Sequence, residues 1–62
     1  MSELHLVVNG DPRSVPAPAT VAGLLSHLGL DARMVVVEVN REIIRRPRHP
    51  EVTLRDGDTV EL

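Results

Sequence analysis

The chain is short and slightly acidic, with 62 residues, 42% of them hydrophobic, and a formal net charge of −2. A chain of this length forms one domain, near the lower size limit for folding without help. It has no cysteine, so neither a disulfide nor a cysteine-ligated zinc can reinforce it, and aliphatic packing must hold the fold. It has no aromatic residue either, which removes the usual stacking platforms for single-stranded nucleic acid.

Nothing in the chain has the character of a targeting or membrane segment. The start, Met1-Ser2-Glu3, is acidic, and the apolar run after it is too short for a signal peptide. No stretch approaches the roughly 20 apolar residues that span a bilayer. We therefore expect a cytoplasmic protein without a membrane partner.

A β-hairpin is the first predicted element. Residues 3–8 alternate between apolar and polar side chains, as in a half-buried strand. Asn9-Gly10 follows, and this pair is the strongest short hairpin signal. Residues 13–15 would then return antiparallel, and two prolines close the strand.

One helix is predicted next. Thr20 is a good N-cap for a helix over residues 21–28. Four apolar residues recur at helical spacing and form one stripe: Val21, Leu24, Leu25 and Leu28. Gly29 sits where a left-handed C-cap belongs, and Leu30 can fold back onto the last turn.

Three strands are predicted after the helix. Residues 35–39 are rich in valine and form the strongest of them. Asn40-Arg41 turns the chain into a shorter strand over residues 42–45, after which two prolines end pairing, as suits a sheet edge. The tight turn Asp56-Gly57-Asp58 then leads into a last, alternating strand over residues 59–62.

This order of elements predicts an α+β fold. A ferredoxin-like fold would need a second helix and more length. A β-grasp (ubiquitin-like) fold fits, with one helix packed across a mixed sheet of four or five strands and the first and last strands parallel at its centre. The predicted core is Leu6, Val8, Leu24, Leu25, Leu28, Val37, Val39, Leu54, Val60 and Leu62.

The chain offers little chemistry of its own. No serine lies in a G-x-S-x-G context, and the four glycines are isolated, so no catalytic residue and no phosphate-binding loop is expected. His5, His27 and His49 lie far apart in the sequence, so we expect solvated surface histidines and no metal site.

Arginines are concentrated in one segment. Four of the seven lie between positions 41 and 48, followed by His49. Such a cluster can bind phosphate or an acidic partner, or it can be an ordinary solvated edge. With an acidic balance and no aromatics, nucleic acid is the weaker choice.

Four stretches together resemble the ThiS family of sulfur carrier proteins along essentially the whole chain. They are V-N-G at 8–10, A-T-V-x-x-L-L-x-x-L-G-L at 19–30, V-x-V-N-x-E-I-I at 37–44 and D-G-D-x-V-E at 56–61. The small subunit of molybdopterin synthase is similar, but its members are longer between the helix and the last strand.

The resemblance implies a β-grasp protein that acts as a co-substrate and is not itself an enzyme. A ThiF-type adenylating enzyme would use ATP to activate a C-terminal Gly-Gly, and a sulfur donor such as a cysteine desulfurase would supply sulfur. The resulting thiocarboxylate would serve the thiazole synthase ThiG in thiamine biosynthesis. No cofactor would be bound, and the free protein would be a monomer.

The sequence departs from the family at its end, because it stops at Leu62 without Gly-Gly. We expect the domain, residues 1–62, to be followed by a short flexible tail that ends in Gly-Gly. The alternatives are a carrier for molybdopterin synthesis or tRNA thiolation, and a TGS-like β-grasp module that binds without covalent chemistry.

A partner-docking face is predicted on the side of the sheet that the helix leaves open. Its residues are Val7, Val36, Glu38, Glu61 and Leu62. An apolar centre with a polar rim is typical of recognition patches, although scattered exposed valines are normal on any sheet.

Overall fold

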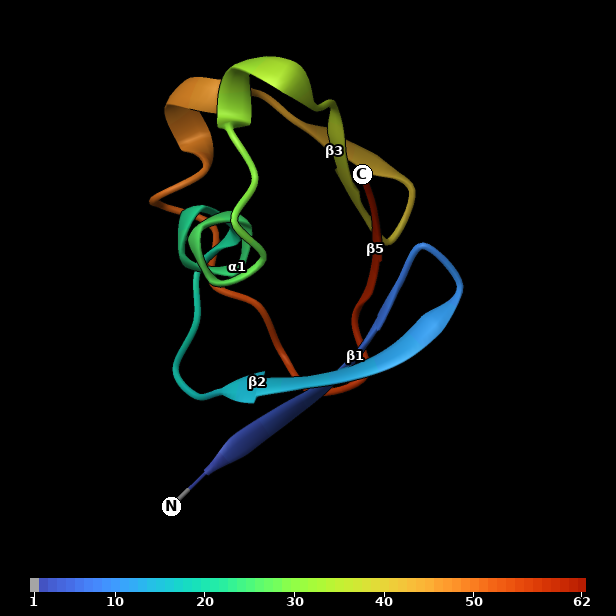
Figure 1. Ribbon diagram of the computed structural model, residues 1–62. Coiled ribbons are helices and arrows are strands. Elements are labelled where there is room, and N and C mark those ends of the chain that lie inside the picture. The colour runs from blue at the N-terminus through green and yellow to red at the C-terminus, as the bar shows by residue number, and fades with distance from the viewer. Residues whose placement is uncertain (1) are drawn as a thin grey trace.

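The computed structural model describes residues 2–62 as a five-stranded mixed sheet with one α-helix packed across one face (Figure 1). The elements are β1 Glu3–Val8, β2 Asp11–Pro16, α1 Val21–His27, β3 Val37–Val39, β4 Glu42–Ile44 and β5 Thr59–Glu61, with short 3-10 turns at Ala32–Met34 and Arg46–Arg48. The strand order is β2-β1-β5-β3-β4, and only β1 and β5 run parallel. The predicted β-grasp arrangement, with first and last strands side by side in the middle, is confirmed.

The first hairpin forms where Asn-Gly predicts it. Val8 pairs with Asp11, which leaves a two-residue loop in which Asn9 and Gly10 have φ values of 51° and 84°. Two positive φ values match a type I′ turn, whose twist suits a hairpin. The return strand β2 covers residues 11–16 and is longer than the predicted 13–15.

Helix α1 has the predicted caps at both ends. The Thr20 side chain accepts the Gly23 N–H at 3.0 Å. At the other end, Leu30 N–H donates to Leu25 O and Gly29 N–H to Ser26 O, with Gly29 at φ 72°, which is a Schellman motif. The helix ends at His27, one residue before the predicted end, with Leu28 as its C-cap.

The strand predicted over 35–39 is shorter in the structure. Asp31 caps a 3-10 turn by accepting the Arg33 N–H at 2.9 Å, and the chain that follows is extended at Val35. However, the neighbouring strands offer partners only to residues 37–39, so pairing starts at Val37. Strand β4 ends at Ile44 and not at residue 45, because the next 3-10 turn begins there.

The buried core overlaps the prediction without matching it. Its residues are Leu6, Val8, Val15, Val21, Leu24, Leu25, Val37, Val39, Ile44, Leu54 and Val60. Val15, Val21 and Ile44 were not in the predicted core. Leu28 and Leu62, which were, are only half-buried, because each follows the end of its element at the rim of the core.

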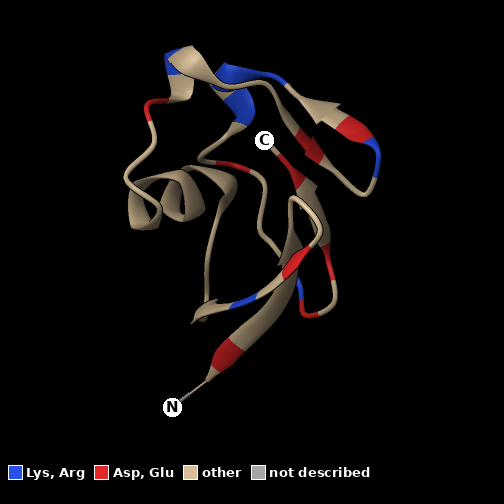
Figure 2. Ribbon diagram, turned by 45° about the vertical axis from the view of Figure 1, so that its right-hand side comes forward, with Lys and Arg blue, Asp and Glu red and all other residues tan. Residues whose placement is uncertain are grey.

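The expectation of solvated histidines is wrong for His49, which is 4% exposed. Its Nε2–H donates to the Ile44 carbonyl at 3.0 Å, and its own carbonyl accepts the Ala22 N–H. The 3-10 turn before it folds the arginine-rich segment back on the sheet, which buries the ring. The arginines of this segment stay exposed: Arg45, Arg46 and Arg48 lie around the 3-10 turn, whereas Arg41 lies in the β3–β4 turn beside Glu42 (Figure 2).

Within residues 2–62, no helix has both the length and the apolar character that crossing a bilayer requires.

Candidate docking face and strand exit

The face of the sheet that α1 leaves open carries the predicted docking residues except Leu62, whose side chain packs against the core. Along β3 and β5 the side chains alternate, so Val39 and Val60 are buried while Glu38 and Glu61 face outward. Glu38 and Glu61 are direct partners in the β3–β5 pairing. Val7 on β1 faces the same side and is 37% exposed.

Glu38 and Glu61 place two negative charges directly opposite each other on neighbouring strands. Like charges directly opposite each other on neighbouring strands destabilise a sheet. The ion pairs formed within the described part of the chain are His5–Asp56 and Arg33–Asp31, so neither glutamate has a cationic partner among residues 2–62. The pair therefore leaves an uncompensated negative charge beside the exposed apolar side chains of Val36 and Ile43.

The structure gathers most of the predicted face into one shallow hollow beside the last strand. The hollow is lined by Met34, Val35, Val36, Glu38, Glu61 and Leu62. Four of the five predicted residues are thus together, while Val7 lies outside the hollow, across β5. Whether a partner binds here stays a prediction.

Sequence reasoning missed three residues of this surface, the first of which is the half-buried Val35 in the wall of the hollow. Ile43 is 63% exposed and pairs with Glu38, and Met34 is 80% exposed at the hollow's edge. The register of the second hairpin could have revealed Ile43, because it puts that residue opposite Glu38. The exposure of Met34 depends on a 3-10 turn over Ala32–Met34, which no pattern in the sequence predicted.

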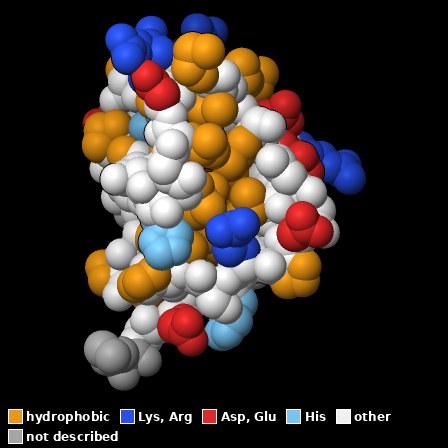
Figure 3. Space-filling view, in the orientation of Figure 1, with side chains coloured by type: hydrophobic (Ala, Val, Ile, Leu, Met, Phe, Trp, Pro, Cys, Tyr) orange, Lys and Arg blue, Asp and Glu red, His pale blue; other side chains and the backbone are white. Residues whose placement is uncertain are grey.

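Strand β5 leaves the sheet at a defined point next to the first hairpin turn. Asn9 donates its backbone N–H to Val60 O at 2.9 Å, and its Oδ1 accepts the Leu62 N–H at 2.8 Å. The Leu62 side chain packs against the core. In Figure 3, hydrophobic side chains form a column down this side of the molecule, between α1 and the end of the chain. The role of Asn9 could not be read from the sequence, where it marks only a turn.

The other end of β5 is held by the second hairpin turn. Asn40, also in the left-handed region, donates its N–H to Thr59 O at 2.7 Å and accepts the Thr59 N–H on Oδ1 at 3.0 Å. Its Nδ2 donates to Asp58 Oδ1 at 3.0 Å. The start of the strand is therefore tied to the loop before it.

That loop is the predicted Asp-Gly-Asp turn. Gly57 has φ 90°, and Asp58 Oδ2 accepts the Arg55 N–H at 2.8 Å. Asp56 Oδ1 accepts the backbone N–H of His5 at 2.6 Å and lies 3.2 Å from the His5 ring Nδ1. The backbone hydrogen bond from His5, aided by the ring, lowers the pKa of the Asp56 carboxyl.

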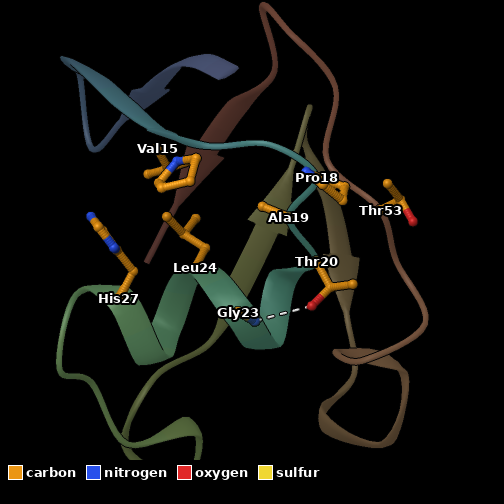
Figure 4. A pocket seen from close by; sticks show the side chains of 9 residues that line it. Val15, Pro18, Ala19, Thr20, Gly23, Leu24, His27 and Thr53 are labelled. Atoms are coloured by element: carbon orange, nitrogen blue, oxygen red, sulfur yellow. Dashed lines mark hydrogen bonds between the residues drawn. The ribbon is translucent and has the colours of Figure 1, made fainter. Parts of the chain in front are cut away.

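A further hollow lies on the opposite side, between β2 and α1 (Figure 4). Its walls include Val15, Pro18, Leu24 and His27, and the Thr20–Gly23 capping bond crosses its floor. His27 is its one titratable side chain, and no carboxylate or second histidine lines it. The hollow therefore offers neither an acid–base pair nor a group of metal ligands.

The fold and the exit of β5 define a class: a β-grasp protein whose central last strand ends at the surface beside an apolar, acidic face. The model of the ThiS family matches residues 6–62. The chain therefore belongs to the ThiS family.

Similar proteins fall into two groups. The chain is 42% identical over 59 residues to a thiazole synthase of Paramagnetospirillum magneticum, a match covering 95% of this chain but 18% of that protein. It is 42% identical over 43 residues to the sulfur carrier protein ThiS of Bacillus subtilis, covering 69% of this chain and 65% of the other. Thus the chain spans less than a fifth of the thiazole synthase, and just under two thirds of the carrier is matched.

Among solved structures, the chain resembles the crystal structure of the thiamine biosynthesis protein ThiS from Geobacter metallireducens. The TM-score is 0.84 at 39% identity, and the match covers 94% of this chain and 88% of that one. A solution structure of a thiamine biosynthesis protein from the same organism matches with a TM-score of 0.81. The observed sheet and helix are therefore those of the family.

Proposed function

We propose that this protein is a sulfur carrier of thiamine biosynthesis. The observation that carries the proposal is the family match over residues 6–62, supported by the identity to the Bacillus subtilis carrier. The described residues bring together no group of three or more potential metal ligands. The chain also lacks cysteine, so sulfur would have to be held on the backbone terminus and not on a side chain.

The chemistry of the carrier requires an activating enzyme. A carboxylate is a poor electrophile until a good leaving group is attached. The terminal glycine carboxylate would attack the α-phosphate of ATP on a ThiF-type enzyme, releasing pyrophosphate and forming an acyl adenylate. The terminal persulfide sulfur of a donor such as a cysteine desulfurase would then displace AMP to give an acyl disulfide. A second thiol would reduce this acyl disulfide by bonding to the donor sulfur, which releases the thiocarboxylate and leaves a disulfide on the donor. Glycines at the tail suit this step, because they enter a narrow site without Cβ clashes.

The recipient of the sulfur would be the thiazole synthase ThiG. Two thiazole synthases contain a region similar to this chain, at 42% and 35% identity. A carrier-like region within the synthase chain supports an association between the two proteins. It also means that a carrier domain can be part of a longer chain, so continuation of this chain beyond Leu62 does not by itself favour a non-covalent module.

The activating enzyme would dock on the face around Val36, which is 67% exposed. This face adjoins Leu62, from which the tail would extend, and Glu38 and Glu61 would select a basic surface on the enzyme. Docking there would place the tail next to the site that adenylates it.

Intact-mass analysis tests the proposal. The full-length protein is incubated with a ThiF-type enzyme, ATP and a sulfur donor, and each component is omitted in turn. We expect one terminal oxygen to be replaced by sulfur only in the complete mixture. Conversion without the activating enzyme, or a coding sequence that lacks a terminal Gly-Gly, contradicts the mechanism. A charged carrier that serves molybdopterin synthase but not thiazole synthase contradicts the assigned pathway.

A further inference from the structure

We propose that Asn9 is a positioning residue: its side chain fixes the point and direction at which the chain leaves β5, and so orients the C-terminal segment for the activating enzyme. This inference rests on the proposed function, because it concerns the tail that the carrier needs. Nothing about the type I′ turn itself requires an asparagine that reaches β5, since Gly-Gly also forms such turns.

The argument starts from the regular pattern of a parallel ladder. There, every second residue of one strand donates its N–H to one residue of its neighbour and accepts from the residue two further along. Val7 donates to Asp58 O at 3.0 Å, and Asn9 donates to Val60 O at 2.9 Å, so β1 follows this pattern up to Asn9. The next bond would run from the Leu62 N–H to the Asn9 backbone carbonyl.

That last backbone bond is replaced by a side-chain bond. At φ 51° the chain turns away from β5 at Asn9, and the Leu62 N–H bonds to the carboxamide Oδ1 at 2.8 Å instead. The side chain thus adds one more bond to the parallel ladder after the backbone has left it. Only a short side chain with an acceptor oxygen can do this from a left-handed position.

The extra bond moves the point from which the tail can swing. Without it, the last residue of β5 held by a neighbouring strand is Glu61, which pairs with Glu38 on β3, one residue earlier. One extended residue spans about 3.3 Å, so the tail would pivot that much further from its exit and sweep a wider volume. The Leu62 side chain, half-buried against the core, would then be the sole contact at that point.

The orientation of the C-terminal carboxylate affects the rate of the chemical step more than it affects the affinity of docking. The docking face is built mainly by β3, β5 and the segment at 34–36, and the Asn9 side chain reaches it only through the Leu62 amide at its edge. Loss of the bond should therefore lower kcat for adenylation while KM stays nearly unchanged.

The test uses a matched pair of variants in the full-length chain. Asn9→Gly keeps a residue that tolerates positive φ but removes the acceptor, whereas Asn9→Asp keeps both. With Asn9→Gly we expect the Leu62 amide to exchange with solvent roughly 2- to 10-fold faster, the range that corresponds to one net hydrogen bond. We expect kcat for adenylation to fall by a similar factor at unchanged KM, and Asn9→Asp to restore both.

Each result decides the matter. Equal Leu62 exchange in the two variants, equal kcat in spite of different exchange, or a rise in KM without a fall in kcat would overturn the positioning role. Amide exchange is measured on the free protein, so it tests the bond even if the wild-type chain proves not to be adenylated. That last outcome would contradict the proposed function and leave the Asn9–Leu62 bond measured independently.

Discussion

Each end of β5 is held by the side chain of an asparagine in a hairpin turn, but the two asparagines have different roles. At each end an asparagine in a type I′ turn donates its backbone N–H to a β5 carbonyl and accepts a backbone N–H on Oδ1. Asn40 makes both bonds with Thr59, whereas Asn9 bonds the Val60 carbonyl and the Leu62 N–H. Asn40 makes a third bond, from Nδ2 to Asp58, and so ties the strand to the loop before it. Asn9 instead binds the Leu62 amide, at the point where the chain leaves the sheet. One end therefore concerns stability, and the other concerns the exit of the chain.

The largest expected effect is a difference in the free energy of unfolding between variants of Asn40 and Asn9. Asn40→Gly keeps a residue suited to positive φ but removes two side-chain hydrogen bonds, so the free energy of unfolding should fall by about 1–2 kcal/mol. Asn9→Gly removes one such bond at the edge of the fold and should cost less. Urea unfolding followed by circular dichroism measures both. A larger loss for Asn9→Gly would break the comparison.

Val36→Asp probes the surface beside the exit. A carboxylate placed next to Glu38 and Glu61 adds repulsion and removes apolar contact, so affinity for a ThiF-type enzyme should fall about tenfold. The free energy of unfolding should change little, because Val36 is exposed. Ser14→Asp, on β2 at the far edge of the sheet, is the control that adds the same charge. Affinity for the enzyme is measured by calorimetric titration. If Val36→Asp binds the enzyme as tightly as the wild type, this face is not part of the docking site.

A pH series on Asp56→Asn tests how the loop before β5 contributes to the stability of the fold. The folded protein lowers the pKa of Asp56 below its ordinary value of 3.8, so the carboxylate stabilises the fold above that pH and the contribution is lost on acidification. The variant keeps an acceptor oxygen without the charge. The wild type should therefore be the more stable above the ordinary pKa of 3.8, and the difference should shrink as the pH falls below it. A difference that grows towards acid pH would contradict the sign.

The smallest effect has the opposite direction. Glu61→Gln relieves the repulsion across the β3–β5 pair, so the free energy of unfolding should rise by a few tenths of a kcal/mol. Added salt should erase this gain, because it screens exposed charges. The same substitution should weaken enzyme binding, which would mark the pair as kept for recognition. Thermal unfolding at low and high salt gives the first result, and titration with the enzyme gives the second.

Local patterns predicted the elements whose causes are local. Asn9-Gly10, the Thr20 cap, the Gly29 C-cap and the Gly57 turn each depend on a few neighbouring residues, and each is observed. Strand lengths were less well predicted, because a strand ends where its partner does. The extended chain at Val35 finds no neighbour and stays outside β3.

The candidate site was predicted in part. Alternation along the strands placed Val36, Glu38 and Glu61 on the open face, and the hollow beside Leu62 brings them together. Ile43 and Met34 were missed, because their exposure depends on a register and on a 3-10 turn.

The amino-acid sequence by itself determined the order of elements, the turn positions, the β-grasp fold and, through its motifs, the resemblance to ThiS. Propensity, spacing and capping act over a few residues, so they can be read along the chain. Only the tertiary structure decided that His49 is buried, that Glu38 faces Glu61, and that Asn9 holds Leu62. Those contacts join residues brought together by pairing and packing, and their partners are unknown until strand order and register are set.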